Sequence, residues 1–154
     1  MHLVANIDVD DLEKGIEFYE RALGLRLERR LFDNTVAEMR GASGQIYLLE
    51  KPAGSRPCVD RPILRDYQRH WTPVHLDFVV GNIEAAAQRA QAAGATLEGN
   101  AQTEEWGRVA IMSDPFGHGF CLLEFSGVES DAAARRKKGQ RKGRLARHVT
   151  ARSR

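Results

Sequence analysis

The 154-residue sequence contains only two cysteines, Cys58 and Cys121, and it has no long apolar run. Two cysteines exclude a disulfide scaffold or a cysteine-rich zinc module, and they favour a reducing cytoplasm. A helix that spans a membrane needs about 20 consecutive apolar residues, so we expect no membrane association. The first residues lack the basic and apolar segments of a secretory signal, which again favours the cytoplasm.

Two common catalytic motifs are also missing. The glycines do not form a phosphate-binding loop, and no Gly-x-Ser-x-Gly nucleophile elbow occurs. Nucleotide hydrolysis and the serine chemistry of α/β-hydrolases therefore have no support in the sequence.

The net charge of +2 hides two regions of opposite charge. Residues 1–127 contain 13 Lys and Arg against 19 Asp and Glu, whereas residues 128–154 contain 10 against 2. The C-terminal region has too few apolar residues to build a core, so we predict a disordered basic tail over 128–154. Clusters of Lys and Arg can neutralise phosphates, but this tail has no aromatic residue to stack on a base. A solubilising extension is therefore favoured over a nucleic-acid-binding arm.

The remaining residues repeat one pattern. Residues 4–10 and 75–80 each alternate between apolar and polar and then run into an amphipathic helical pattern that ends at Gly24 or Gly94. Asp11 and Asn82 are placed to cap these helices. Three more strands are predicted after each helix, at 25–31, 36–40 and 45–50, and at 96–98, 109–113 and 120–125. The pattern predicts an α+β fold of two tandem β-α-β-β-β modules.

We predict one domain over residues 1–127, with module 1 at about 2–51 and module 2 at about 73–126. The linker, residues 52–72, is rich in proline, and about 20 residues is long for a connection within a compact domain. It is expected to carry a short helix around 63–69 or to cover a site as a lid. His70 falls in this linker and is expected to be exposed, whereas His118 lies in a tight turn and is expected to be structural.

Three segments carry a resemblance to a known family: Asp11–Tyr19 with Leu23-Gly24, His75–Val80 and Asp114–Leu122. In this order they resemble the vicinal oxygen chelate superfamily, which includes glyoxalase I, bleomycin-resistance proteins and extradiol dioxygenases. The resemblance covers about residues 2–126, and its last segment looks most like the glyoxalase-like subgroup. It implies that the two modules form a curved mixed sheet around a concave cup that holds the ligand and, in many members, a divalent metal.

The resemblance also implies one metal-ligand position on the first and last strand of each module, commonly filled by two His and two Glu. The matching positions here hold Val4, Tyr47, His75 and Cys121. Only His75 is an expected ligand. His2 is one alternative, and Glu50 and Glu124 are another, although strand alternation turns both glutamates to the opposite face. We therefore expect at most a weak site for Zn, Ni, Fe or Mn on His75, without the full ligand set.

The cup is nevertheless expected to be polar, because the face that carries His75 also carries polar side chains at alternate positions. Trp106 is a candidate aromatic wall, and Arg108 a candidate partner for an anionic group. The candidate ligand-binding residues are Asn6, Asp8, Tyr47, His75, Asp77, Trp106, Arg108 and Cys121. No residue is assigned a catalytic role.

Two functional hypotheses remain open. The first is a protein that resembles the bleomycin-resistance proteins and binds a small polar or aromatic molecule in the cup without the full metal site. The second is a metal-dependent enzyme that resembles lactoylglutathione lyase or a related isomerase or dioxygenase. The expected partner is a small molecule. A homodimer is compatible with either hypothesis but is not required, because one chain already holds two modules.

Overall fold

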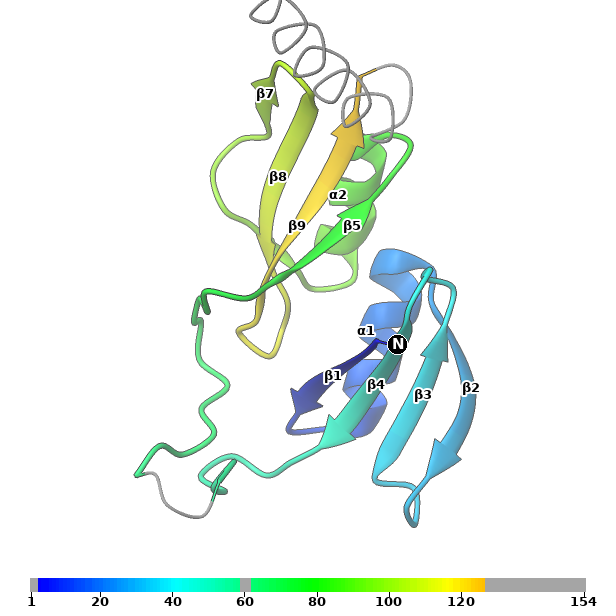
Figure 1. Ribbon diagram of the computed structural model, residues 1–154, viewed down its shortest axis with the longest axis vertical. Coiled ribbons are helices and arrows are strands. Elements are labelled where there is room, and N and C mark those ends of the chain that lie inside the picture. Colours follow the sequence, from blue (N-terminus) through cyan, green and yellow to red (C-terminus); the bar gives the residue numbers. More distant parts are fainter. Residues whose placement is uncertain (1–2, 59–61, 127–154) are drawn as a thin grey trace, which may run out of the picture.

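The computed structural model describes residues 3–58 and 62–126, which form two units of similar topology (Figure 1). The first unit consists of β1 (Val4–Val9), α1 (Leu12–Leu23), β2 (Arg26–Leu31), β3 (Val36–Arg40) and β4 (Gln45–Glu50). The second unit consists of β5 (Leu76–Val79), α2 (Ile83–Ala92), β6 (Thr96–Leu97), β7 (Gln102–Glu104), β8 (Gly107–Ser113) and β9 (Gly119–Phe125). The predicted α+β fold is confirmed. The predicted basic tail lies outside the described residues, as does His2.

Each module has its own mixed sheet, with the module's first strand at one edge. The strand order is β1-β4-β3-β2 in module 1 and β5-β9-β8-β6 in module 2. In both sheets the first strand pairs in parallel with the last, and the other pairs are antiparallel. Asn6 lies opposite Tyr47, and Asp77 lies opposite Cys121. These two pairs occupy equivalent places in the two modules.

β7 is a strand that the sequence does not indicate. Its three residues are polar and exposed, so the alternation that marks a half-buried strand is missing. It forms an antiparallel hairpin with the start of β8, where Glu104 lies opposite Gly107. Module 2 therefore has one strand more than the repeat predicts.

The two helices begin and end where the sequence predicts. The side chain of Asp11 accepts a hydrogen bond from the backbone N–H of Lys14, and Asn82 does the same for Ala85. Gly24 follows α1 with a φ of 71°, a left-handed conformation that glycine adopts without steric cost. α1 and α2 also contact each other, which brings the two modules together.

The core lies between each sheet and its helix. Figure 1 shows each helix behind its own sheet. The strand residues that point toward the helices are buried and apolar, and they include Val9, Leu48, Met39, Met112 and Leu122. The opposite faces of the two sheets carry no helix among the described residues. These helix-free faces hold the polar residues that strand alternation assigns to the cup.

The linker is extended and is fixed to both modules. Residues 62–69 contain no helix, so the expectation of a short helix around 63–69 is wrong. Polar contacts hold this segment instead, because Arg65 pairs with Asp8 at 2.7 Å and the Tyr67 hydroxyl donates to the Lys51 carbonyl at 2.6 Å. A helix would require the backbone of Arg65 to bond within the segment, but it bonds to residues 54 and 55.

The linker then passes close to the β8–β9 turn. The backbone N–H of His70 donates to the Gly117 carbonyl at 2.9 Å. Gly117 has a φ of 83°, and a Cβ atom there would overlap the Gln68 carbonyl oxygen. This contact therefore requires glycine for both its backbone conformation and its lack of a side chain.

Neither helix in the described ranges combines the length and the apolar character that crossing a membrane would require.

Candidate functional site

Three of the predicted ligand-binding residues meet on the helix-free face of module 2. His75 immediately precedes β5, Asp77 lies within it, and Cys121 lies opposite Asp77 on β9. His75 Nε2 is 3.2 Å from Asp77 Oδ1, and the potential ligand atoms of all three residues lie within 4.8 Å of one another. The ring of Trp71 covers His75, with ring centroids 4.7 Å apart. Strand register thus produces a compact polar cluster beneath an aromatic ring.

The thiol of Cys121 is protonated in this cluster at neutral pH. Burial, together with the charge of the adjacent Asp77 carboxylate and the hydrogen bond that this carboxylate accepts, raises the pKa of Cys121 to about 11. Only the thiolate form is a good nucleophile or metal ligand. The cluster therefore presents a neutral thiol, a carboxylate and an imidazole that contact one another.

The residues do not fit the four-ligand metal centre that the family resemblance implies. Val4 offers no donor atom. Tyr47 lies opposite Glu38 on the neighbouring strand, and it interacts with Arg29. Among the described residues, no group of three His, Cys, Asp or Glu side chains combines donors from both modules. The donors of His75, Asp77 and Cys121 all come from module 2.

Glu124, the other candidate ligand, points toward α2. Its Oε2 accepts a 2.5 Å hydrogen bond from the backbone N–H of Ile83 at the start of the helix. The carboxylate therefore satisfies a helix N-terminus. This placement agrees with the strand alternation and leaves Glu124 on the face opposite Cys121.

The helix-free face of module 1 carries a buried carboxylate that the sequence analysis did not single out. Glu38 is fully buried, and its Oε2 accepts a 2.6 Å bond from Arg29 Nε. Gln45 donates to the other oxygen at 3.3 Å. The Glu38 carboxylate raises the pKa of the Arg29 guanidinium by hydrogen bonding and by its charge. Strand alternation places Glu38 beside Tyr47, and that parity is the signal that would have identified it.

The side chain of Asp8 forms an ion pair with the linker. Its carboxylate forms the 2.7 Å ion pair with Arg65, and both side chains are partly buried. Its backbone carbonyl accepts a 2.7 Å hydrogen bond from His118. Burial and the Asp8 charge raise the pKa of the neighbouring Tyr67 to about 12. Asp8 therefore anchors the linker to β1.

Trp106 and Arg108 lie elsewhere in module 2. The Trp106 ring packs against Phe125, with centroids 5.7 Å apart, and it is partly exposed. Arg108 forms an ion pair with Glu84 of α2, which places its side chain on the helix side of the sheet. The structure does not bring these two residues to His75.

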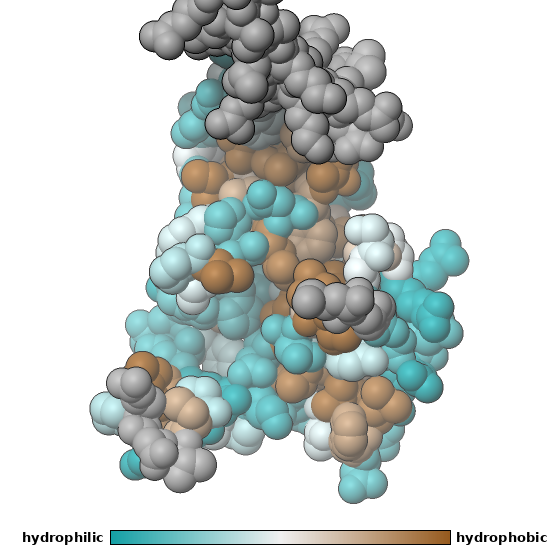
Figure 2. Space-filling model, viewed as in Figure 1, coloured by the Kyte–Doolittle hydropathy of each residue, from teal (hydrophilic) through white to brown (hydrophobic). Residues whose placement is uncertain are grey.

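A cavity of about 370 Å³, here called the β1–β5 cavity, lies between the first strands of the two modules. Its apolar walls include Leu3, Val4, Val74 and Phe120, and its polar groups include Asn6 and His75. No Asp, Glu, Lys or Arg is among the described residues that line it. Leu3 and Val74 are each 82% exposed, and Figure 2 shows hydrophobic surface where the two modules meet.

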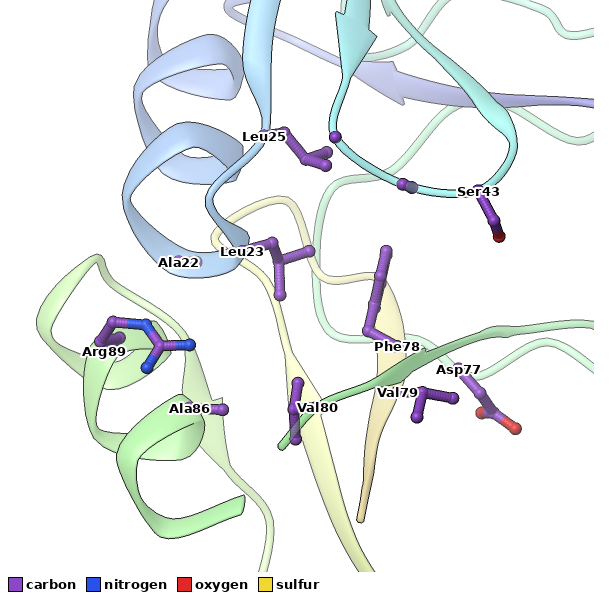
Figure 3. A pocket seen from close by; sticks show the side chains of 12 residues that line it. Ala22, Leu23, Leu25, Ser43, Asp77, Phe78, Val79, Val80, Ala86 and Arg89 are labelled. Atoms are coloured by element: carbon purple, nitrogen blue, oxygen red, sulfur yellow. The ribbon is translucent and has the colours of Figure 1, made fainter. Parts of the chain in front are cut away.

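A second cavity of about 350 Å³, here called the α1–β5 cavity, lies between the end of α1, the β3–β4 loop and module 2. Figure 3 shows Leu23 and Leu25 of module 1 on one side of this cavity and Phe78 and Val80 of module 2 on the other. The carboxylate of Asp77 lies at its edge (Figure 3). Asn6 and His75 therefore share one cavity, while Asp77 borders the other.

His70 differs from the expectation that it is exposed. It is half-buried, and its Nε2 is 2.9 Å from Nδ1 of His118. Sequence reasoning missed this pair because 48 positions separate the two residues and no periodic pattern links a linker to a turn.

Comparison with known proteins supports the fold described above. The sequence profile of the family described as "Glyoxalase-like domain" matches residues 4–123. "Putative glyoxylase CFP32" of Mycobacterium bovis and its counterpart of the same name in Mycobacterium tuberculosis are each 30% identical over 118 residues, which is 75% of this chain. The chain spans 40% of the length of these curated relatives.

Solved structures share the fold at low identity. A glyoxalase-related enzyme from Fulvimarina pelagi aligns with a TM-score of 0.60 and 16% identity, over 80% of this chain and 87% of that one. TnmS3, an antibiotic binding protein from a Streptomyces species, aligns with a TM-score of 0.57 and 23% identity, over 82% of this chain and 96% of that one. At these identities the similarity shows the fold alone.

Proposed function

The chain belongs to the glyoxalase-like domain family of the vicinal oxygen chelate superfamily, and on this premise we propose that it binds a small polar or aromatic molecule without a four-ligand metal centre. The observation that carries the proposal is the β1–β5 cavity, which has apolar walls and the polar groups of Asn6 and His75. Small-molecule sites typically combine apolar walls with a few polar groups in a volume of about 300–1,000 Å³.

The surroundings of His75 support an aromatic or polar ligand. The Trp71 ring already stacks against the His75 imidazole, and it is 47% exposed. An exposed aromatic surface beside a polar side chain suits a ligand with a flat ring and a hydrogen-bonding group. TnmS3, which shares the fold, is an antibiotic binding protein, so the fold itself is compatible with the binding of a small molecule.

The proposal is tested with 1-anilinonaphthalene-8-sulfonate as an aromatic probe and isothermal calorimetry as the readout. We expect one probe molecule per folded chain. Val4→Trp fills the β1–β5 cavity and should abolish binding. Val79→Trp, a matched control in a residue that lines only the α1–β5 cavity, should leave binding unchanged. Binding that survives Val4→Trp but is lost in Val79→Trp would overturn the assignment to the β1–β5 cavity.

A metal-dependent, lactoylglutathione lyase-like enzyme is the second candidate function. The approach of His75, Asp77 and Cys121 favours it, because nitrogen, oxygen and sulfur donors lie close enough to share one ion. Binding would require Cys121 to lose the proton that burial and Asp77 hold in place.

Elemental analysis of protein purified without an affinity tag separates the two functions. Stoichiometric Zn, Ni, Fe or Mn that is lost in His75→Ala would favour the enzyme. The ligand-binding proposal expects no metal at this cluster and no lactoylglutathione lyase activity after addition of any of these ions.

We further propose a cytoplasmic location for the protein, which its two unpaired cysteines support.

A further inference from the structure

We propose that His70 and His118 form a second, separate cation site that takes a divalent transition-metal ion with octahedral or tetragonal geometry, such as Ni²⁺ or Cu²⁺. The proposal does not rest on the ligand-binding function, although both histidines border the β1–β5 cavity. None of its donors belongs to the cluster of His75, Asp77 and Cys121.

The hydrogen-bond partners of the two rings show which ring nitrogens carry a proton. The nitrogens that face away from the other ring are called the outer nitrogens here. His70 Nδ1 is 2.9 Å from the Gln68 carbonyl oxygen, and His118 Nε2 is 2.7 Å from the Asp8 carbonyl oxygen. A carbonyl oxygen only accepts, so both outer nitrogens must carry hydrogen. In two neutral rings the inner nitrogens, His70 Nε2 and His118 Nδ1, then each present a lone pair.

These two lone pairs lie 2.9 Å apart. Two acceptors at this distance repel each other unless a cation, either an additional proton or a metal ion, lies with them. The pair is therefore built to bind positive charge.

The distance between the inner nitrogens selects the coordination geometry. Imidazole nitrogens bind transition metals at about 2.0–2.1 Å, and at that bond length a separation of 2.9 Å corresponds to an angle of about 90° at the metal. This is the angle between neighbouring ligands in octahedral and square-planar complexes, which Ni²⁺ and Cu²⁺ favour. A tetrahedral ion would require the nitrogens to move apart to about 3.3 Å.

The surrounding structure holds both rings in place. Metal-bound histidines usually donate their second ring nitrogen to a carbonyl or carboxylate, and both rings here already make that bond. The backbone N–H of His118 donates to Asp114 Oδ1 at 2.9 Å, and that of His70 donates to Gly117. The rings of Tyr67 and His118 pack in a T-shaped arrangement. Little reorganisation is needed before an ion binds.

Charge and access also suit a cation. The buried carboxylate of Asp114 lies next to His118, while the nearby Asp8 carboxylate is already paired with Arg65. His70 and His118 are half-buried, and both line the β1–β5 cavity. Water or an oxygen of a ligand in the cavity can therefore occupy the remaining coordination positions.

The test titrates tag-free, full-length protein with Ni²⁺ and Cu²⁺. Calorimetry should show one ion per chain at this site, and the Cu²⁺ electron paramagnetic resonance spectrum should show coupling to two imidazole nitrogens. His70→Gln and His118→Gln should each weaken binding by about tenfold or more and leave coupling to one imidazole. His75→Gln is the matched control and should change neither the affinity nor the spectrum.

A measurement on the wild-type protein removes any dependence on variants that fail to fold. Bound Ni²⁺ or Cu²⁺ should broaden the amide resonances of Gln68, Gly117 and Asp8 most strongly. Broadening centred on Cys121, or confined to residues near His2 or His148, would overturn the proposal. Absence of binding at concentrations up to about 1 mM would overturn it as well.

Discussion

The hydroxyl of Tyr19 donates a 2.7 Å hydrogen bond to Oδ2 of Asp114, a buried contact between residues 95 positions apart. It connects α1 of module 1 to the β8–β9 turn of module 2. The other oxygen of Asp114 accepts bonds from the backbone N–H groups of Phe116 and His118, each at 2.9 Å. One carboxylate therefore shapes the turn that carries His118 and joins that turn to the other module.

Replacing Tyr19 by Phe should destabilise the protein by about 1–3 kcal/mol, because the buried Asp114 carboxylate loses a hydrogen-bond donor. Chemical denaturation at neutral pH measures the change. Tyr67→Phe is a suitable comparison, since the Tyr67 hydroxyl bonds to a carbonyl in a partly buried position and its loss should have a smaller effect. An unchanged free energy of unfolding in Tyr19→Phe would contradict this role.

Asp114 should also make stability depend on pH. Burial raises the pKa of Asp114 above its ordinary value of 3.8, although the charge of His118 and several hydrogen bonds oppose the shift. Between the ordinary and the raised pKa the folded state binds more protons than the unfolded state, so stability falls as pH rises through that window. The cost is fully present above the raised pKa and is relieved as pH falls.

Asp114→Asn lacks this titration. The difference in free energy of unfolding between wild type and variant should therefore move in favour of the wild type as pH is lowered from about 7 to about 4. Taking the difference cancels the opposite contribution of Glu84 and Glu98, whose pKa values are lowered by Arg108 and Arg69. A difference that does not vary with pH would refute the prediction.

The two cysteines should react at very different rates. Cys58 is exposed, whereas Cys121 is buried with a pKa of about 11, which leaves about a hundredfold less thiolate at neutral pH than the ordinary value of 9.0. A thiol reagent should modify Cys58 first and Cys121 slowly, as peptide mass spectrometry over time would show. Asp77→Asn should accelerate modification of Cys121, because it removes the charge that opposes the thiolate. Equal rates at both cysteines would contradict the structure.

Gly117→Ala should detach the linker from the β8–β9 turn, since its Cβ would overlap the Gln68 carbonyl and its backbone has a φ of 83°. We expect lower thermal stability and faster proteolysis within residues 62–70. Gly44→Ala is the matched control, because no atom lies within 4 Å of a Cβ there and its φ is ordinary. Proteolysis rates that do not differ between the two variants would argue against the contact.

The sequence predicts the fold well because the decisive signals are local. Strand alternation and the capping residues Asp11 and Asn82 depend on neighbours within a few positions, and both helices begin where these residues indicate. β7 escapes prediction because its polar residues pair only at an exposed edge. The extended conformation of the linker is not predicted, because Arg65 and Tyr67 bind residues in other parts of the chain.

In the candidate site, too, the contacts that follow from local patterns are predicted from the sequence, and those that depend on the path of the linker are not. His75, Asp77 and Cys121 come together because strand parity and register follow from the repeat. The pairing of His70 with His118 depends on the path of the linker, which no local pattern encodes. Strand alternation also accounts for the placement of Arg108, which shares a face of β8 with the buried Ala110 and Met112 and therefore meets Glu84 on the helix side.

The duplication within one chain has a consequence for how such a site evolves. Asn6 and Asp77 occupy equivalent positions, as do Tyr47 and Cys121. In a symmetric dimer of single modules, each substitution would appear twice in the cup. Here a substitution in one module leaves the other module unchanged. Module 2 can therefore present the carboxylate of Asp77 and the thiol of Cys121, while module 1 presents the amide of Asn6 and the phenol of Tyr47. An asymmetric molecule can then meet a different chemical group on each side.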